Sequence, residues 1–304
     1  MISIRKFAPI ALAIGMSFAG AAQAATSSNF NLKDGQGNTI VAGANTLDWS
    51  SAGSGVAIGI GPFSATTQLT VGREFDFRYQ ANLVAVNGGT PTALLPRLDT
   101  SSDGATQSFY DYEFTIVAKL REVVTGVGAV GTTPSATFGL GGTNADNKVA
   151  IYYDTARNSN TTAGTGFDDG TLIALLTIVN DGTTSNFGVT GADSGQGSAK
   201  LGAAIMEQGD FINTAYLENV ERLLFGLDFE STLNYPAGAG ATSNFHIGGS
   251  SLFGDYQVGA NDIVFKVDGS NTFNQVPEPG SMVLLGVGLL GFVGAARRRK
   301  ATKA

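Results

Sequence analysis

Cysteine is absent from this 304-residue chain, and histidine and tryptophan each occur once. Without thiols the chain has no disulfides, no thiolate nucleophile and no cysteine ligands for zinc. A single histidine, His246, cannot build the His₂ or His₃ sets of zinc enzymes, and it is the only base available to a Ser-His-Asp triad. Because no serine is placed beside it by sequence, we expect His246 to be an ordinary surface or sheet-edge residue.

Charged residues are also scarce, at 14%, and the basic ones are unevenly spread. Seven of the 18 lie near the chain ends, which leaves eleven basic residues against 25 acidic ones between residues 25 and 280, a net charge near −14. An acidic body disfavours nucleic acid as a partner and favours the attraction of cations.

Enzyme motifs are missing too. There is no H-E-x-x-H and no G-x-S-x-G. Two G-x-G-x-x-G matches occur, but Gly126–Gly131 leads into Thr-Thr-Pro instead of a helix, and Gly286–Gly291 lies in an apolar run. We therefore expect a protein that is not an enzyme. An exported glycoside hydrolase that uses two carboxylates stays open, although no acid stands out as placed in an apolar pocket.

What the chain does contain is glycine, 42 residues of it, and apolar residues in alternation with polar ones. Glu74–Val86 and Tyr110–Val124 alternate over many positions, which predicts strands with one wet face and one packed face. Shorter strands are expected near residues 30–40, 56–60, 136–140, 149–153, 172–179, 187–190, 223–229 and 262–267. The fold class predicted is all-β, an antiparallel β-sandwich of jelly-roll type.

Within that body, residues 25–272, the sole candidate for a helical turn is Tyr216–Arg222. The only tryptophan, Trp49, is predicted to be a core anchor. We expect one domain, with a division in a Gly191–Gly197 loop as the alternative.

Acidic turns, at residues 144–147 and 167–170, precede two consecutive predicted strands. Asp154 ends one strand, and Asp168 and Asp169 precede the next, so neighbouring strands would bring them to one end of the sandwich. Carboxylate and carbonyl oxygens are hard ligands of the kind that calcium prefers. We therefore hypothesise a calcium site at these residues. The simpler interpretation is that the acidic residues only form turns.

The amino-terminal residues have the features of a secretory signal. Arg5 and Lys6 precede an apolar segment, Ile10–Ala22, and Ala22 and Ala24 fit an A-x-A cleavage site. We expect residues 1–24 to be a signal peptide, and the alternative is a first transmembrane helix.

The carboxyl-terminal residues have three parts in fixed order. Pro277, Glu278 and Pro279 form an extended segment, Met282–Ala296 is apolar, and Arg297, Arg298 and Arg299 begin a basic cluster. As a helix the apolar run would reach roughly 22 Å, less than the ~30 Å hydrocarbon core, which suits a temporary anchor. An ordinary membrane tail is the alternative.

This tail, residues 273–304, resembles the PEP-CTERM sorting signal. The resemblance implies handling by an exosortase in the inner membrane, a cut near Pro277–Pro279 and release of the body to the cell surface or extracellular matrix. The segments Tyr152–Asp154 and Gly166–Leu172 are similar to flocculation-associated members of that group, which implies a role in an exopolysaccharide matrix.

These features favour a structural or adhesive surface protein that acts in cell aggregation or biofilm. A carbohydrate-binding module is the alternative, with Tyr152, Tyr153, Tyr235 and Tyr256 as candidate platform residues. Apart from calcium, no cofactor is expected.

Overall fold

The structure is a computed structural model that describes residues 29–60, 69–128, 135–179, 184–191, 194–200, 210–220, 223–229, 252–254, 256–259 and 261–275. The long strands are β3 (Thr46–Ala57), β4 (Glu74–Asn87), β6 (Glu113–Val127) and β15 (Ile263–Gln275). Shorter elements complete the chain: β1 (Phe30–Lys33), β2 (Thr39–Ala44), β5 (Thr90–Pro91), η1 (Leu95–Arg97), β7 (Ser135–Leu140), η2 (Asn144–Asp146), β8 (Lys148–Asp154), β9 (Thr171–Thr177), β10 (Thr184–Gly191), β11 (Ser194–Lys200), β12 (Phe211–Ile212), β13 (Leu217–Glu218) and β14 (Leu223–Phe229).

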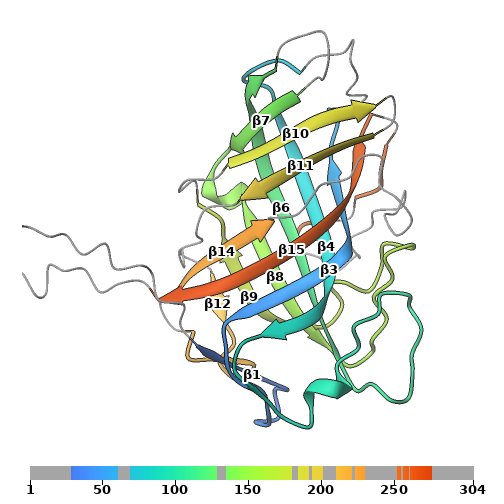
Figure 1. The fold of residues 1–304 in the computed structure, drawn as a ribbon, viewed down its shortest axis with the longest axis vertical. Coiled ribbons are helices and arrows are strands. Elements are labelled where there is room, and N and C mark those ends of the chain that lie inside the picture. Colours follow the sequence, from blue (N-terminus) through green and yellow to red (C-terminus); the bar gives the residue numbers. More distant parts are fainter. Residues whose placement is uncertain are drawn as a thin grey trace, which may run out of the picture.

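The strands form two antiparallel sheets, which confirms the predicted all-β, antiparallel class. The larger sheet has the order β12-β9-β8-β6-β4-β3-β15-β14-β11-β10-β7, and β7 also pairs with β6. Eight of its strands, from β6 through β4 and β15 to β7, therefore form a closed hydrogen-bonded ring. Figure 1 shows β10, β11, β14 and β15 crossing in front of β4, β6 and β8, so two layers face each other.

Strand β6 pairs with two different strands along the same edge. Its first half, from Glu113 to Lys119, pairs with β8, and its second half, from Glu122 to Val127, pairs with β7. The sheet thus divides at β6 into the closed ring and the β8-β9-β12 extension. The small sheet, β13-β1-β2-β5, lies at one end of the molecule (Figure 1).

The core lies between the layers and is lined by the inward positions of the long strands. Trp49 is fully buried, as predicted, and its indole Nε1 donates a hydrogen bond of 2.6 Å to Oδ1 of buried Asn271. Phe30 from the small sheet packs edge-on against Phe273 of β15, with ring centroids 4.9 Å apart. One apolar cluster therefore joins both sheets.

The outer face of the larger sheet is drier than the sequence indicates, so the prediction of a wet face is wrong for the middle of β4. Arg78, Gln80 and Asn82 are all buried there. Loops cover this face: Asn82 donates to the carbonyl of Ser101, and Phe253 packs on a second apolar cluster that contains Val117 and Tyr152. An alternating strand shows which residues share a face but not what lies upon that face.

Two further predictions need correction. The helical turn predicted at Tyr216–Arg222 is not formed at Leu217 and Glu218, which are strand β13 and pair with Leu32 and Asn31 of β1; the last two residues of the predicted segment lie outside the described residues. Much of the predicted Gly191–Gly197 loop is strand β11, which forms a hairpin with β10. Glycine-rich and serine-rich segments have low strand propensity, so ladder hydrogen bonds rather than side chains define this hairpin.

Candidate functional site

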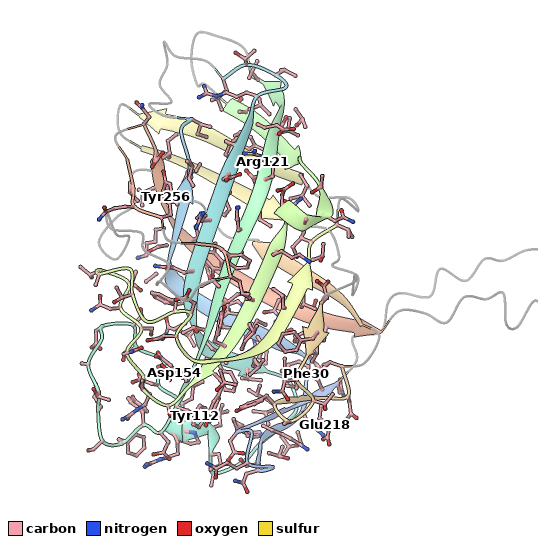
Figure 2. All side chains as sticks on the ribbon, turned by 180° about the vertical axis from the view of Figure 1, so that it is seen from behind. Phe30, Tyr112, Arg121, Asp154, Glu218 and Tyr256 are labelled. Atoms are coloured by element: carbon pink, nitrogen blue, oxygen red, sulfur yellow. The ribbon has the colours of Figure 1, made fainter. Side chains whose placement is uncertain are left out.

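The predicted calcium residues lie where strands β8 and β9 meet the loop of residues 155–170. Asp154 is the last residue of β8 and is nine-tenths buried, and Asp168 is buried as well. Asp169 is exposed and accepts a 3.0 Å hydrogen bond from Nδ2 of Asn158. The structure thus brings all three aspartates to one end of the β8–β9 pair, since β9 begins at Thr171 opposite Tyr153. Figure 2 shows Asp154 at the same end of the molecule as Tyr112.

Glu113 joins this acidic group, although no pattern in the sequence singles it out. It opens β6 directly opposite Asp154, and only 1% of it is exposed. The backbone N–H of Ser159 donates 3.0 Å to Oε1 of Glu113, and the Ser159 hydroxyl donates to Oε2. Glu113 therefore holds the 155–170 loop against the sheet.

Burial sets the electrostatics of this pair. It raises the pKa of Glu113 to about 7, against the lowering effect of the Ser159 hydrogen bonds, and the nearby charge of Asp154 adds to the rise. Burial also raises the pKa of Asp154, and the charge of Asp169 contributes. Burial therefore disfavours the ionised form of both carboxyl groups.

A preformed metal cage is not evident in this group. Within the described ranges, no three His, Cys, Asp or Glu side chains converge as a metal site would need. One observation still favours a cation: Oδ2 of Asp154 is buried and has no hydrogen-bond partner. Calcium at Asp154, Asp168 and Asp169 therefore stays a prediction.

A second buried acid, Glu122, lies inside the strand ring. Its cross-strand neighbours are Phe75 of β4 and Leu140 of β7, both buried. Burial alone raises the pKa of Glu122 to about 8. The burial of Glu122 could have been predicted from the sequence. Even-numbered positions from Tyr112 to Leu120 point inward, and the same alternation places Glu122 inward.

The three described tyrosines among those considered for a sugar platform do not form one. Tyr152 and Tyr153 are buried at 4% and 9% exposure, and Tyr256 packs under the guanidinium of Arg78, 5.2 Å from its ring centroid. Tyr235, like His246, lies outside the described residues. Figure 2 places Tyr256 far from Tyr112, so the described candidates are spread over the molecule.

The exposed aromatic residue that the sequence did not single out is Phe109, which is 56% exposed. The guanidinium of Arg97 lies 5.1 Å from its ring centroid, and Tyr110 packs edge-on against it. Arg97 is fixed in turn by a two-point bond to Asp111, at 2.8 and 2.6 Å. The Phe109 ring is therefore exposed and held at the surface by Arg97 and Tyr110.

Residues 1–24 and 276–304 lie outside the described residues, and with them Ala22, Ala24, Pro277, Glu278, Pro279 and the arginines 297–299. The first three residues of the predicted tail, 273–275, are instead the end of β15. In the part of the chain that the structure covers, no helix has the length and hydropathy to cross a membrane. No curated protein and no solved structure matches the chain. Residues 275–300 match the family described as PEP-CTERM protein-sorting motif. The chain therefore carries the PEP-CTERM sorting motif that the sequence predicts, which implies an exported protein, transiently anchored in the membrane, that an exosortase sorts and processes.

Proposed function

We propose that the β-structured body is a structural or adhesive protein of the cell surface or extracellular matrix, acting in cell aggregation or biofilm. The observation that supports this most is the position of β15. This strand ends at Gln275, where the sorting motif begins, and it is paired on both sides, with β3 and β14. Any force between the body and its attachment point enters the molecule through a doubly paired strand of the larger sheet.

We also propose that the body is not an enzyme. The buried acids that could donate a proton, Glu113 and Glu122, are 1% and 7% exposed, and each is enclosed by its own strand neighbours or loop. A general acid must reach its substrate, so such burial supports a structural role for both groups. Turnover of matrix polysaccharide by the purified exported protein would contradict this proposal.

Gene deletion tests the surface role. We expect the deletion strain to lose cell aggregation or biofilm, and the intact gene to restore it. A matched variant with Pro277, Glu278 and Pro279 all replaced by alanine should make the same body but fail to restore aggregation, because the body is not sorted. Normal aggregation in the deletion strain would overturn the proposal.

Carbohydrate binding is the second candidate, and Phe109 is the observation that favours it. A fixed, exposed ring offers an apolar face to the C–H groups of a sugar. A glycan array on the exported protein, with Phe109→Ala beside it, separates this function from a purely structural one. We expect binding that the substitution lowers at least several-fold, and an array without signal would contradict the binding function.

A further inference from the structure

Three polar side chains are enclosed between the larger sheet and the loops that cover its outer face. Ser54 of β3 lies directly opposite Gln80 of β4, and Asn82 is the next outward residue of β4. Gln80 and Asn82 alternate with Tyr79 and Ala81, which are in the core, so all three side chains project from the outer face. Each of the three is 0% exposed. They are called the outer polar group below.

The covering loops are hydrogen-bonded to the sheet around this group. Nδ2 of Asn82 donates 3.2 Å to the carbonyl of Ser101. Thr115, directly opposite Asn82 on β6, donates 2.7 Å from its hydroxyl to a carbonyl of the loop before β9. On the other side of Gln80 along β4, Nη1 of Arg78 donates 2.6 Å to the carbonyl of Gly254. Three separate loops therefore close the outer polar group off from bulk solvent.

Four buried atoms of the outer polar group have no hydrogen-bond partner among the described residues. They are the hydroxyl oxygen of Ser54, both amide atoms of Gln80, and Oδ1 of Asn82. A buried polar atom that leaves water without gaining a partner destabilises the folded state, and several together would offset much of the stability of a typical domain. The folded protein therefore needs a binding partner for these atoms inside the covered region.

The same atoms define the chemistry of that partner. Oε1 of Gln80 and Oδ1 of Asn82 accept hydrogen bonds, Nε2 of Gln80 donates, and the Ser54 hydroxyl does both. A metal cation would leave Nε2 unpaired, and it would be repelled by Arg78 of β4 and by Lys266 of β15, the other cross-strand neighbour of Ser54. An anion supplies no donor to the two amide oxygens. Water supplies donors and acceptors from one small neutral molecule.

We propose that Ser54, Gln80 and Asn82 form a sealed binding site for ordered water beneath the covering loops. Bound water bridges β3 and β4 by pairing with Ser54 and Gln80 at once, and it extends to Oδ1 of Asn82. Because Asn82 also bonds to Ser101, the water belongs to the connection that holds this loop on β4. The site does not depend on the surface function proposed above.

A high-resolution crystal structure of the exported protein, with a bromide soak beside it, tests the site directly. We expect water density within hydrogen-bond distance of both Ser54 and Gln80, and no anomalous bromide signal there. Direct hydrogen bonds among Ser54, Gln80 and Asn82, with no density between them, would overturn the proposal. A bromide signal at the site would overturn it as well, because the site would then bind an anion.

Substitutions that displace the water give a second test. Ser54→Val puts methyl groups where water binds and leaves Gln80 unpaired, so the melting temperature should fall by roughly 3–6 °C. In a Gln80→Met background those amide atoms are gone, and the same substitution should cost clearly less. Thr115→Val is the matched control, because its hydroxyl bonds directly to a loop carbonyl, and it should keep the bound water in the crystal. Equal costs of Ser54→Val in the two backgrounds would contradict the site.

A measurement on the unaltered protein in solution keeps the test independent of whether a variant folds. Water enclosed by three loops exchanges slowly, so the side-chain amide protons of Gln80 should show nuclear Overhauser effects to water with the sign of a long-lived contact. The amide protons of an exposed residue such as Gln107 should show no such contact. Assigned Gln80 amide protons without a cross-peak to water would overturn the proposal.

Discussion

Glu122 carries a carboxyl group into an apolar interior, between Phe75 and Leu140. An acid whose pKa rises on folding takes up a proton in the folded state that the unfolded chain has already lost. Folding stability is then fully retained below the ordinary glutamate pKa and lost as the pH rises toward the folded value. Glu113 and Asp154 act in the same direction.

The first prediction concerns this pH dependence. Between pH 5 and about 8, ionisation of Glu122 should lower the free energy of unfolding by up to about 1.4 kcal/mol per pH unit. Glu122→Gln should flatten that slope, measured by urea unfolding across the range. Glu74→Gln, an exposed glutamate on the neighbouring strand, is the control and should keep the wild-type slope. Parallel slopes for wild type and Glu122→Gln would contradict the assignment.

The second prediction concerns the buried bond between Trp49 and Asn271. Asn271→Ala leaves the indole N–H unpaired in the core, which should lower the free energy of unfolding by about 2 kcal/mol. In a Trp49→Phe background the donor is gone, so the same substitution should cost clearly less. A double-mutant cycle followed by circular dichroism measures the difference, and strict additivity would show that the bond contributes nothing.

At the scale of the element, alternation predicted the strands well where one face is apolar throughout. Glu74–Val86 and Tyr110–Val124 correspond closely to β4 and β6. Alternation did not predict β11, where backbone pairing rather than the side-chain pattern defines the strand. Nor did it predict β13, which is a strand only because it pairs with β1. The residue pattern of a segment does not show which strand it will pair with.

The same reason explains the mixed outcome at the candidate sites. Chain order could place Asp154 beside Asp168 and Asp169, because β8 and β9 are consecutive. It could not place Glu113 opposite Asp154, since that contact joins residues 41 positions apart through the register of β6 and β8. Arg78, Lys119 and Lys148 lie directly opposite one another across β4, β6 and β8, and this row depends on two registers that are equally invisible in sequence.

The third prediction tests calcium at the 155–170 loop. If Asp154, Asp168 and Asp169 bind calcium, millimolar Ca²⁺ should raise the melting temperature, EDTA should lower it, and Mg²⁺ should have a smaller effect. Asp169→Asn should remove the response. Asp111→Asn, an exposed acid paired with Arg97, should leave it intact. A melting temperature that changes with neither calcium nor EDTA would contradict the calcium site.

For the whole molecule, the sorting motif fixes a fourth prediction. Intact mass of the exported protein should show loss of residues 1–24 and a second cut near Pro277–Pro279, with any attached group as added mass. Replacement of Pro277, Glu278 and Pro279 by alanine should leave the membrane-bound precursor, seen by fractionation. An exported form that keeps Arg297, Arg298 and Arg299 would contradict the processing scheme.

A fifth prediction separates body from tail. A chain that stops after Gln275 should fold and melt like the processed protein, because β15 is complete. A chain that stops after Asp262 lacks β15 and should not fold, since β3 and β14 lose their shared neighbour. Circular dichroism of both shows the contrast, and a cooperative melt of the shorter chain would contradict this account of the ring.

The strand that closes the ring is also among the last parts of the body to emerge during secretion. Until β15 arrives, β3 has an open edge and β14 has no partner on that side, so the segments already outside remain an incomplete sheet with sticky margins. A cut made after β15 has paired therefore releases a closed ring, whereas a body released earlier would expose the open edge of β3 to other chains.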